Sequence, residues 1–386
     1  MEINNLMCDK ICFYPYGKEA TSMRAINSIK RGLFLKTAFK FVLVLSCLLC
    51  APLGLAQTST DTQNPGHLVV SFIDVGQGDS ILVEFPNDEV MLVDAGPTEM
   101  GQTVVRYLRS REIDNIDILV ATHPHDDHIG GMLDVLGAFS IGKVWDSGYN
   151  HGSQAQENFL ALIQSKGIQF GTPRAGFFQE IGDARIEILA PGEFLLSGTD
   201  SDPNNNSIVM LVTYGGISFL LTGDMQGEER QTRDSWPECT VLKVAHHGSA
   251  NGTDANFLTA VSPEVAVVSY GLDNSYGHPA QETRNLLRQN GCAVKSTASN
   301  GTITISTDGK TFEITTTRGP AVTTTVAPTP PTSSGGGSGN YIGNRNSHIF
   351  HRPSCSYLPN LENRIYFSTR ESAIAAGYQP CQRCNP

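Results

Sequence analysis

The sequence predicts an α/β protein of the α+β type, a layered αββα sandwich followed by a small second domain at the carboxyl end. Between residues 67 and 317, short β-type runs alternate with helix-type segments and fall into two β-rich halves. This pattern is typical of two packed sheets with helices on their outer faces. A Thr-, Pro-, Gly- and Ser-rich segment, residues 318–340, has the composition of a flexible linker and separates this body from residues 341–386.

The first half of the body is expected to hold four strands and two helices. Gly-Gln-Gly and Pro-Asn-Asp turns separate the first three β-type runs. We expect strands over residues 68–75, 80–85, 90–93 and 116–121, and helices over residues 103–111 and 156–166.

The second half is expected to open with a hairpin, because residues 208–213 and 217–221 flank a Tyr-Gly-Gly turn. Further strands are expected over residues 241–245, 265–269, 293–296, 302–306 and 311–315, with one helix over residues 281–289.

Residues 1–56 are expected to be a signal peptide, whose true start is Met23 in one interpretation. A basic stretch precedes the apolar run 41–51, and Gly54 and Ala56 offer small residues for cleavage before Gln57. The run is short for a stable membrane span, which favours a secreted, extracellular protein without a span after cleavage. The alternative is an uncleaved N-terminal anchor that tethers the protein to the membrane.

Removal of this segment would leave a strongly acidic chain. Residues 1–56 hold 7 of the 27 lysines and arginines and 3 of the 38 acidic residues, so the remainder has a net formal charge of −15. Such a charge is unusual for a high-affinity nucleic-acid binder. Bound divalent cations would offset part of it locally.

Five of the nine cysteines lie beyond residue 56. Two of these, Cys239 and Cys292, belong to the body, where they form either a disulfide or two buried thiols. The sequence leaves both alternatives open.

The most informative motif is a cluster of histidines and aspartates directly after the apolar run 116–121. Three imidazoles and two carboxylates fall within six residues: His123, His125, Asp126, Asp127 and His128. Loops that follow a buried strand commonly present functional side chains, and this ligand set suits zinc, manganese or iron. The alternative, a polar surface loop, does not account for the H-x-H-x-D-H spacing.

Four other motifs also place an acid or an imidazole just past a β-type run. Asp74 and Asp94 belong to the first half, whereas Asp224 and the pair His246 and His247 belong to the second. One edge of a sandwich could therefore collect ligands from distant parts of the chain.

Together these motifs resemble the metallo-β-lactamase superfamily and, more narrowly, the extracellular hydrolase domain of ComEC-type competence proteins. Residues 73–80, 222–224 and 246–249 carry the narrower match, and residues 269–279 strengthen it. The resemblance covers about residues 67–317. It implies a four-layer αββα metallo-β-lactamase sandwich that acts as a free, exported hydrolase domain.

The resemblance also implies a site for two divalent metal ions, held by imidazoles and carboxylates. The implied ligands are His123, His125, Asp127, His128, Asp224 and His247. The first two would hold the first ion and Asp224 would bridge both. Either His246 or His247 would complete the second site, and His247 is favoured. The superfamily's frequent third histidine on the first ion is missing from residues 202–207.

Other residues are expected to support the ligands or to take part in catalysis. Asp94 would fix the tautomer of a ligand histidine, and Asp74 and Asn206 are further supporting candidates. The catalytic candidates are Asp127, His246 and His278, with Lys243 as a further phosphate contact. The alternatives are a satisfied loop histidine at position 278, turn caps at Asp74 and Asp79, and an Asx turn at Asn206 and Ser207.

Two divalent ions about 3.5–4 Å apart can bind and deprotonate a water for attack on phosphorus or a carbonyl. The proposed ligands include no thiolate, so zinc, manganese and iron all remain candidates.

The C-terminal module, residues 341–386, pairs a His-x-x-x-Cys with a Cys-x-x-Cys half-site. It resembles the zinc-binding domain of the Ada DNA-repair protein, and we expect a structural zinc on His351, Cys355, Cys381 and Cys384. His351 occupies the position of Ada's methyl-accepting cysteine, so methyl transfer is not expected. The module has five arginines against two glutamates, which favours contact with DNA phosphate. The alternative is a zinc-stapled tail that binds nothing or binds cell-wall material.

The sequence therefore predicts an exported, binuclear, metal-dependent hydrolase, a ComEC-like phosphodiesterase or nuclease that acts on extracellular DNA. The alternatives are a hydrolase of phosphocholine esters or small phosphodiesters, a β-lactamase, and a non-catalytic protein that binds DNA or the envelope. The oligomeric state is not predicted.

Overall fold

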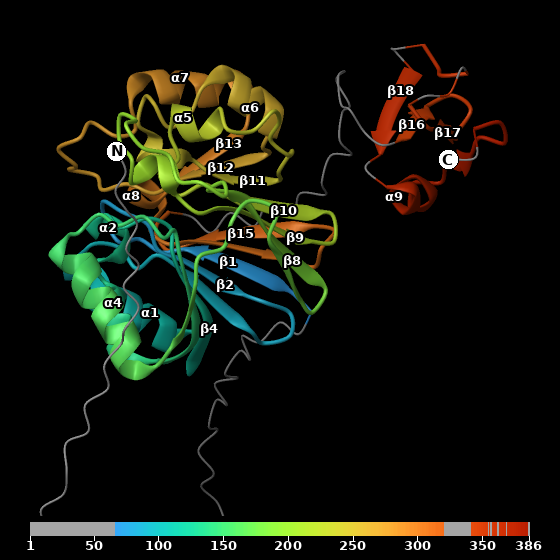
Figure 1. Ribbon diagram of the computed structural model, residues 1–386. Coiled ribbons are helices and arrows are strands. Elements are labelled where there is room, and N and C mark those ends of the chain that lie inside the picture. The colour runs from blue at the N-terminus through green and yellow to red at the C-terminus, as the bar shows by residue number, and fades with distance from the viewer. Residues whose placement is uncertain are drawn as a thin grey trace, which may run out of the picture. The chain divides into compact units, whose positions relative to one another are not determined.

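A computed structural model describes residues 66–319, 341–353, 355, 357–360, 363–367 and 369–384. In the body, residues 66–319, two β-sheets pack face to face; α6 and α7 cover one outer face, and α1 and α4 cover the other (Figure 1). This arrangement confirms the predicted αββα sandwich. The expected signal peptide and all but the first two residues of the expected linker lie outside the described residues.

The first sheet has the strand order β15-β14-β1-β2-β3-β4-β5-β6. Strands β3 to β6 run parallel to one another, so their carboxyl ends meet at one edge. The strands are β1 (Leu68–Phe72), β2 (Ile81–Glu84), β3 (Val90–Val93), β4 (Asn115–Ala121), β5 (Ser140–Asp146), β6 (Gln169–Gly171), β14 (Ile303–Thr307) and β15 (Phe312–Thr316).

The second sheet has the order β13-β12-β11-β10-β9-β8-β7. Strands β10 to β13 are parallel, and β7 to β10 are antiparallel. The strands are β7 (Phe178–Ile181), β8 (Ala184–Ala190), β9 (Val209–Tyr214), β10 (Ile217–Leu221), β11 (Val241–Lys243), β12 (Val265–Val268) and β13 (Ala293–Ser296).

Three apolar layers hold the sandwich together. The central layer, which includes Phe72, Trp145 and Phe219, fills the space between the sheets. A second layer packs the first sheet against α1 (Gly101–Ser110), α3 (Met132–Ala138) and α4 (Gln154–Lys166). A third packs the other sheet against α6 (Ala255–Val261) and α7 (Gln281–Asn290). Cys239 and Cys292 belong to this third layer as free thiols.

Helix α4 shows how local sequence sets these elements. The Ser153 side chain accepts a hydrogen bond from the Gln156 amide at the first turn, and Gly167 ends the helix in the left-handed region with φ 65°. Phe159 and Ile163, four residues apart, lie on the buried face. The sequence therefore specifies both ends of the helix and its packing face.

The structure departs from the expected strands in two ways. Strands β5, β6, β7 and β8 were not expected, because β6 has only three residues and polar residues interrupt the apolar runs of the other three. Two expected strands are shorter: β1 ends at Phe72 and β11 ends at Lys243. In both places the chain leaves the sheet in a tight turn, with φ values of 71° at Gly76 and 48° at His246. These turns deliver side chains to the candidate site.

No helix in the described residues is long and apolar enough to cross a membrane.

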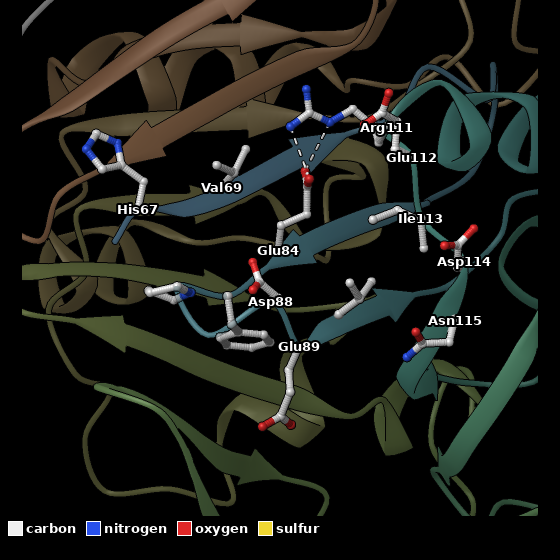
Figure 2. A pocket seen from close by; sticks show the side chains of 13 residues that line it. His67, Val69, Glu84, Asp88, Glu89, Arg111, Glu112, Ile113, Asp114 and Asn115 are labelled. Atoms are coloured by element: carbon white, nitrogen blue, oxygen red, sulfur yellow. Dashed lines mark hydrogen bonds and ion pairs between the residues drawn. The ribbon is translucent and has the colours of Figure 1, made fainter. Parts of the chain in front are cut away.

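A cavity of about 230 Å³ lies at the amino ends of β3 and β4 (Figure 2). Acidic side chains dominate its lining, and Arg111 pairs with Glu84 there at 3.0 Å. None of the predicted site residues lines it. The histidine cluster instead follows the carboxyl end of β4, so this cavity is not the candidate site.

Asp146, at the end of β5, provides a test of how burial affects stability. Burial raises the pKa of its carboxyl to about 6, against the opposing influence of the Gly148 amide and Arg174. A folded-state pKa above the unfolded value of 3.8 means that stability falls as the pH rises from about 4 through 6. We expect Asp146→Asn, which keeps an acceptor for Gly148, to stabilise the protein by about 2–3 kcal/mol at pH 8 and very little at pH 4. Urea denaturation at both pH values measures this, and an equal effect at both would contradict it.

Candidate metal centre

The candidate ligands follow the carboxyl ends of strands in both sheets. Asp94 follows β3 and the histidine cluster follows β4, whereas Asp224 comes after β10 and His247 after β11. β3 and β4 are parallel, and so are β10 and β11. Parallel neighbours end at the same edge of their sheet, so the sandwich gathers these side chains at one place.

Four of the predicted ligands form a compact group. The donor atoms of Asp127, His128, Asp224 and His247 all lie within 4.8 Å of one another. The His247 Nε2 atom lies 3.3 Å from His128 Nε2 and 3.2 Å from Asp127 Oδ2, while Asp224 Oδ1 lies 3.3 Å from His128 Nε2. We call these four residues the quartet. Two imidazoles and two carboxylates at this spacing suit one divalent ion.

The other two predicted ligands lie next to the quartet: the His123 and His128 ring centroids are 4.1 Å apart, and Asp224 Oδ2 lies 3.5 Å from His247 Nε2. His123 Nε2 lies 3.1 Å from His125 Nδ1 and 3.8 Å from Asp224 Oδ2. The other oxygen of Asp224 faces His128 in the quartet. The Asp224 carboxylate is therefore placed to be shared between two ions.

Two buried carboxylate oxygens support the fit of a cation. Within the described residues, Asp224 Oδ1 and Asp79 Oδ1 have no hydrogen-bond donor. A buried acceptor without a donor is costly unless a positive charge lies next to it. The nitrogen and oxygen donors fit zinc, manganese or iron, and the quartet and His123–His125 are the residues that would hold two such ions.

The electrostatics of the quartet also support the fit of a cation. Burial opposes a charge on His128, but Asp224, Asp94 and Asp127 raise the pKa of its ring well above the usual range. Burial likewise opposes a charge on His247, but Asp224 and Asp79 raise its pKa to about 10. Because a metal ligand must be a neutral imidazole, ion binding here would release protons.

His246 and His247 are adjacent residues in a strained turn. Both residues have left-handed backbones, with φ values of 48° and 53°, which is costly for residues other than glycine. The turn points His247 into the quartet. His246 instead lies 3.4 Å from Asn204 Nδ2 through its Nε2 and 3.1 Å from Gln226 Nε2 through its Nδ1. Of the two alternatives, the geometry favours His247 as the ligand.

Asp94 occupies the supporting position that the resemblance implies. Its Oδ2 lies 2.7 Å from His128 Nδ1, and its carboxylate accepts hydrogen bonds from the amide and hydroxyl of Thr122. The backbone carbonyl of Ser269 does the same for His247, because it accepts from Nδ1 at 3.0 Å. Each ring is thereby turned so that Nε2 faces the quartet. No sequence motif reveals a backbone carbonyl, so the Ser269 contact was not expected.

Two supporting candidates from the sequence contact other groups instead. The Asp74 carboxylate pairs with Arg318 and accepts from the Gly76 amide, as a turn cap does. Asn206 braces its loop through both backbone groups of Leu196. Its neighbours make the contacts with the site: Asn204 approaches His246, and Ser207 Oγ accepts from the Asp224 amide at 3.2 Å. These contacts favour the alternatives given for the two residues, a turn cap at Asp74 and a loop brace at Asn206, whereas their supporting roles stay predictions.

A buried Lys243–Asp79 ion pair lies next to the quartet, on the Nδ1 side of the His247 ring. The Lys243 ammonium is fully buried; it donates to the Gly223 carbonyl at 3.1 Å and pairs with Asp79. Asp79 also lies 3.6 Å from His247 Nδ1. Its loop comes this close because Gly78 has no side chain: a Cβ there would lie 2.2 Å from the Asp127 carbonyl oxygen. Lys243 therefore cannot reach a substrate phosphate, contrary to the expectation from sequence.

His278 stands beside the quartet and lines a cavity of about 670 Å³ with it. Its ring lies 5.4 Å from that of His246, and its buried Nδ1 has no hydrogen-bond partner among the described residues. Burial, together with His246 and His247, lowers the pKa of His278 to about 4. The ring is therefore neutral near pH 7 and can form one hydrogen bond with a substrate.

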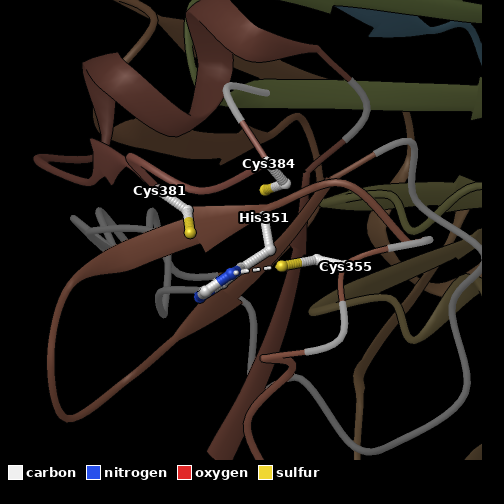
Figure 3. A group of neighbouring side chains, drawn as sticks. All are labelled: His351, Cys355, Cys381 and Cys384. Atoms are coloured by element: carbon white, nitrogen blue, oxygen red, sulfur yellow. Dashed lines mark hydrogen bonds between the residues drawn. The ribbon is translucent and has the colours of Figure 1, made fainter.

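The C-terminal module holds a second candidate metal site (Figure 3). Its sheet contains β16 (Tyr341–Asn344), β17 (Ile349–His351), β18 (Arg364–Phe367) and β19 (Gln379–Pro380), with α9 (Arg370–Ala375) packed against it. The donor atoms of His351, Cys355, Cys381 and Cys384 lie within 4.8 Å of one another. His351 Nδ1 lies 3.3 Å from Cys355 Sγ. The amide hydrogen bonds of Cys384 and Arg383 lower the pKa of Cys381, which favours thiolate and fits zinc.

Comparison with known proteins matches both parts of the chain. A family model described as the metallo-beta-lactamase superfamily matches residues 73–272, and one described as the metal binding domain of Ada matches residues 339–386. ComE operon protein 3 of Bacillus subtilis is 30% identical over 254 residues, which cover 61% of this chain and 32% of the relative. Competence protein ComA of Neisseria gonorrhoeae is 31% identical over 244 residues, covering 61% and 31%.

Recombination protein 2 of Haemophilus influenzae is 30% identical over 244 residues, which cover 61% of this chain and 28% of that protein. The chain thus spans about a third of the length of the curated relatives that it matches.

The buried ion pair yields a stability prediction. Lys243→Met would leave the Asp79 carboxylate buried without its ammonium partner, and we expect it to destabilise the protein by about 3–5 kcal/mol. The double variant Asp79→Asn/Lys243→Met should recover most of this loss, because neither charge remains. Lys166→Met, at an exposed position in α4, serves as the control and should change stability by less than about 0.5 kcal/mol. Urea denaturation measures all three, and additive losses in the double variant would contradict the pairing.

The module's site yields a prediction about metal content. We expect Cys381→Ser to remove one zinc per chain, because three donors hold the ion far less tightly than four. Cys292→Ser, in the body and outside the cluster, should leave the zinc content unchanged. Elemental analysis of the two purified variants beside the wild type measures this. An unchanged zinc content in Cys381→Ser would show that the four residues do not hold zinc.

Proposed function

The chain belongs to the metallo-β-lactamase superfamily of metal-dependent hydrolases, and we propose that it is an exported binuclear phosphodiesterase, a nuclease that acts on extracellular DNA. The observation that carries this proposal is the Asp224 carboxylate, whose oxygens lie 3.3 Å from His128 Nε2, 3.5 Å from His247 Nε2 and 3.8 Å from His123 Nε2. A carboxylate shared in this way suits a pair of ions, and paired ions suit in-line displacement at a phosphodiester.

The side chains of this chain hold and orient the reacting groups. Asp94 and the Ser269 carbonyl fix the rings of His128 and His247, so that the ligand nitrogens need no reorganisation. Divalent ions, when bound, supply Lewis acidity and lower the pKa of water. Neutral His278, at the cavity wall, is positioned to hydrogen-bond a phosphoryl or leaving oxygen. His246, held by Gln226, is the second candidate for that contact.

DNA as the substrate is supported by two observations. Two relatives of the body are named competence protein and recombination protein. The C-terminal module has a net charge of +3, opposite in sign to the body, and exposes Arg383 above the Tyr357 ring at 4.2 Å. We propose that its structural zinc holds a surface that contacts DNA phosphate. His351 stands in place of Ada's methyl-accepting cysteine, so methyl transfer is not part of the proposal.

A second candidate function is hydrolysis of a small phosphodiester or a phosphocholine ester. The cavity itself favours it, because Glu99 and Asp126 line the cavity whereas no lysine or arginine of the described chain does. Long polyanions are repelled by such a wall, and small substrates less so. A non-catalytic binding protein is a further alternative, and two ions per body would favour an enzyme over it.

The decisive experiment is metal-dependent cleavage of single- and double-stranded DNA by the purified protein, with manganese or zinc. We expect cleavage that chelators abolish and that Asp127→Ala reduces by at least roughly 100-fold, because one ligand of the quartet is lost. Asp74→Asn is the matched control: its carboxylate pairs with Arg318 outside the quartet, so activity should persist.

Intact DNA with both metal sites filled would contradict the nuclease proposal. The same preparations, tested on glycerophosphocholine and on a dinucleotide, would then identify the second candidate function.

A further inference from the structure

The mouth of the catalytic cavity differs in character from its floor. The floor consists of charged and imidazole side chains of the metal centre and of buried Val75 and Pro97, whereas the more exposed Met100 and Tyr276 stand at the rim. Within the described chain, neither lysine nor arginine lines the cavity, and Glu99 and Asp126 add negative charge. Ions at the floor would bind one phosphodiester, but the walls offer nothing for further phosphates. Within the cavity, a substrate must therefore gain its remaining binding energy from uncharged groups.

Tyr276 is the largest exposed group at this rim. Its side chain is 70% exposed, although apolar aromatic surface of this size is usually covered. One face of its ring stacks on His278, with centroids 5.6 Å apart and planes inclined by 21°. His278 in turn lies 5.4 Å from His246. The three rings form a row that leads from the metal centre to the surface and ends in a free aromatic face.

Two side chains, Asn274 and Gln77, hold the loop that carries Tyr276 in place. Asn274 donates to the carbonyls of Gly271 and His278 at 2.7 and 2.8 Å and accepts from the His278 amide at 2.9 Å. Gln77, which lines the cavity, accepts from the Gly271 amide at 3.2 Å. The loop that carries the tyrosine is therefore ordered before a ligand binds, so binding costs less conformational entropy.

We propose that the exposed face of Tyr276 is a stacking platform for the nucleobase next to the scissile phosphodiester. This inference rests on the proposed nuclease function and names the part of the substrate that the site recognises. Stacking needs no positive charge and tolerates every base, so it suits a rim without cations. A base that is paired and stacked in a duplex cannot present its face without being unstacked. The platform therefore selects unpaired strands or strand ends.

The test compares Tyr276→Ala, Tyr276→Phe and the control Leu272→Ala, which removes a 72% exposed apolar side chain from the same loop. Steady-state kinetics on a single-stranded oligonucleotide are expected to show KM raised by roughly 5- to 150-fold in Tyr276→Ala, with kcat little changed. Tyr276→Phe and Leu272→Ala should resemble the wild type. On an oligonucleotide that is abasic at the cleavage site, the difference between wild type and Tyr276→Ala should vanish.

Equal KM values for Tyr276→Ala and Leu272→Ala, or the same loss on abasic DNA, would overturn the platform while leaving the nuclease function intact. Fluorescence anisotropy with labelled single-stranded DNA separates the two proposals. If the wild type binds DNA with a Tyr276-dependent Kd but cleaves none, the platform stands and the nuclease function fails. Tyr276-dependent cleavage of glycerophosphocholine, which has no base, would overturn the platform in favour of cation recognition by the same ring.

Discussion

The burial of four carboxylates in one place is the constraint on which the rest of the site depends. Asp79, Asp94, Asp127 and Asp224 surround His128 and His247, and all but Asp127 are almost fully buried. Buried like charges repel strongly and must be matched by positive charge or donors. Three kinds of group meet this demand: the ammonium of Lys243, the two imidazoles, and the amide and hydroxyl of Thr122. Of the two oxygens that remain unmatched, Asp224 Oδ1 lies in the quartet, where a divalent ion would lie, and Asp79 Oδ1 lies on the Nδ1 side of His247.

The two sheets meet this constraint through their geometry. Parallel strands bring the chain repeatedly to one edge, and the candidate ligands lie in the short turns and one-turn helices that follow these strands. Several of these turns have left-handed backbones outside glycine, at Asp94, His246 and His247. Such conformations cost free energy, and they persist only where the surrounding packing dictates them. Among the described residues, three of the seven non-glycine residues with positive φ lie at the candidate metal centre, where the orientation of side chains matters.

The sequence predicted the parts of the site that are contiguous in the chain. The histidine cluster is local, so its spacing alone predicted a metal site, whereas the supporting role of Asp94 was implied by the family resemblance. The Lys243–Asp79 pair joins residues 164 positions apart, and no local pattern links them. Asp74 and Asp79 lie in one motif and differ only in which side of the turn they occupy. The fold decides that, through the close contact of Gly78 with the Asp127 loop.

The chain is acidic, yet its proposed substrate is a polyanion. The two are compatible because bound ions would make the charge positive only at the metal centre. The body carries its excess negative charge around a centre that demands cations, so a bound ion pair, and not the protein surface, would attract the substrate phosphate. Such an attraction acts at one phosphodiester and does not bind the rest of a strand. The remaining binding must come from uncharged contacts at the rim and from a separate basic surface. The chain offers a tyrosine at the rim and an arginine-rich zinc module for these two tasks. Separating them keeps nonspecific anion binding away from the cavity, where it would compete with the substrate.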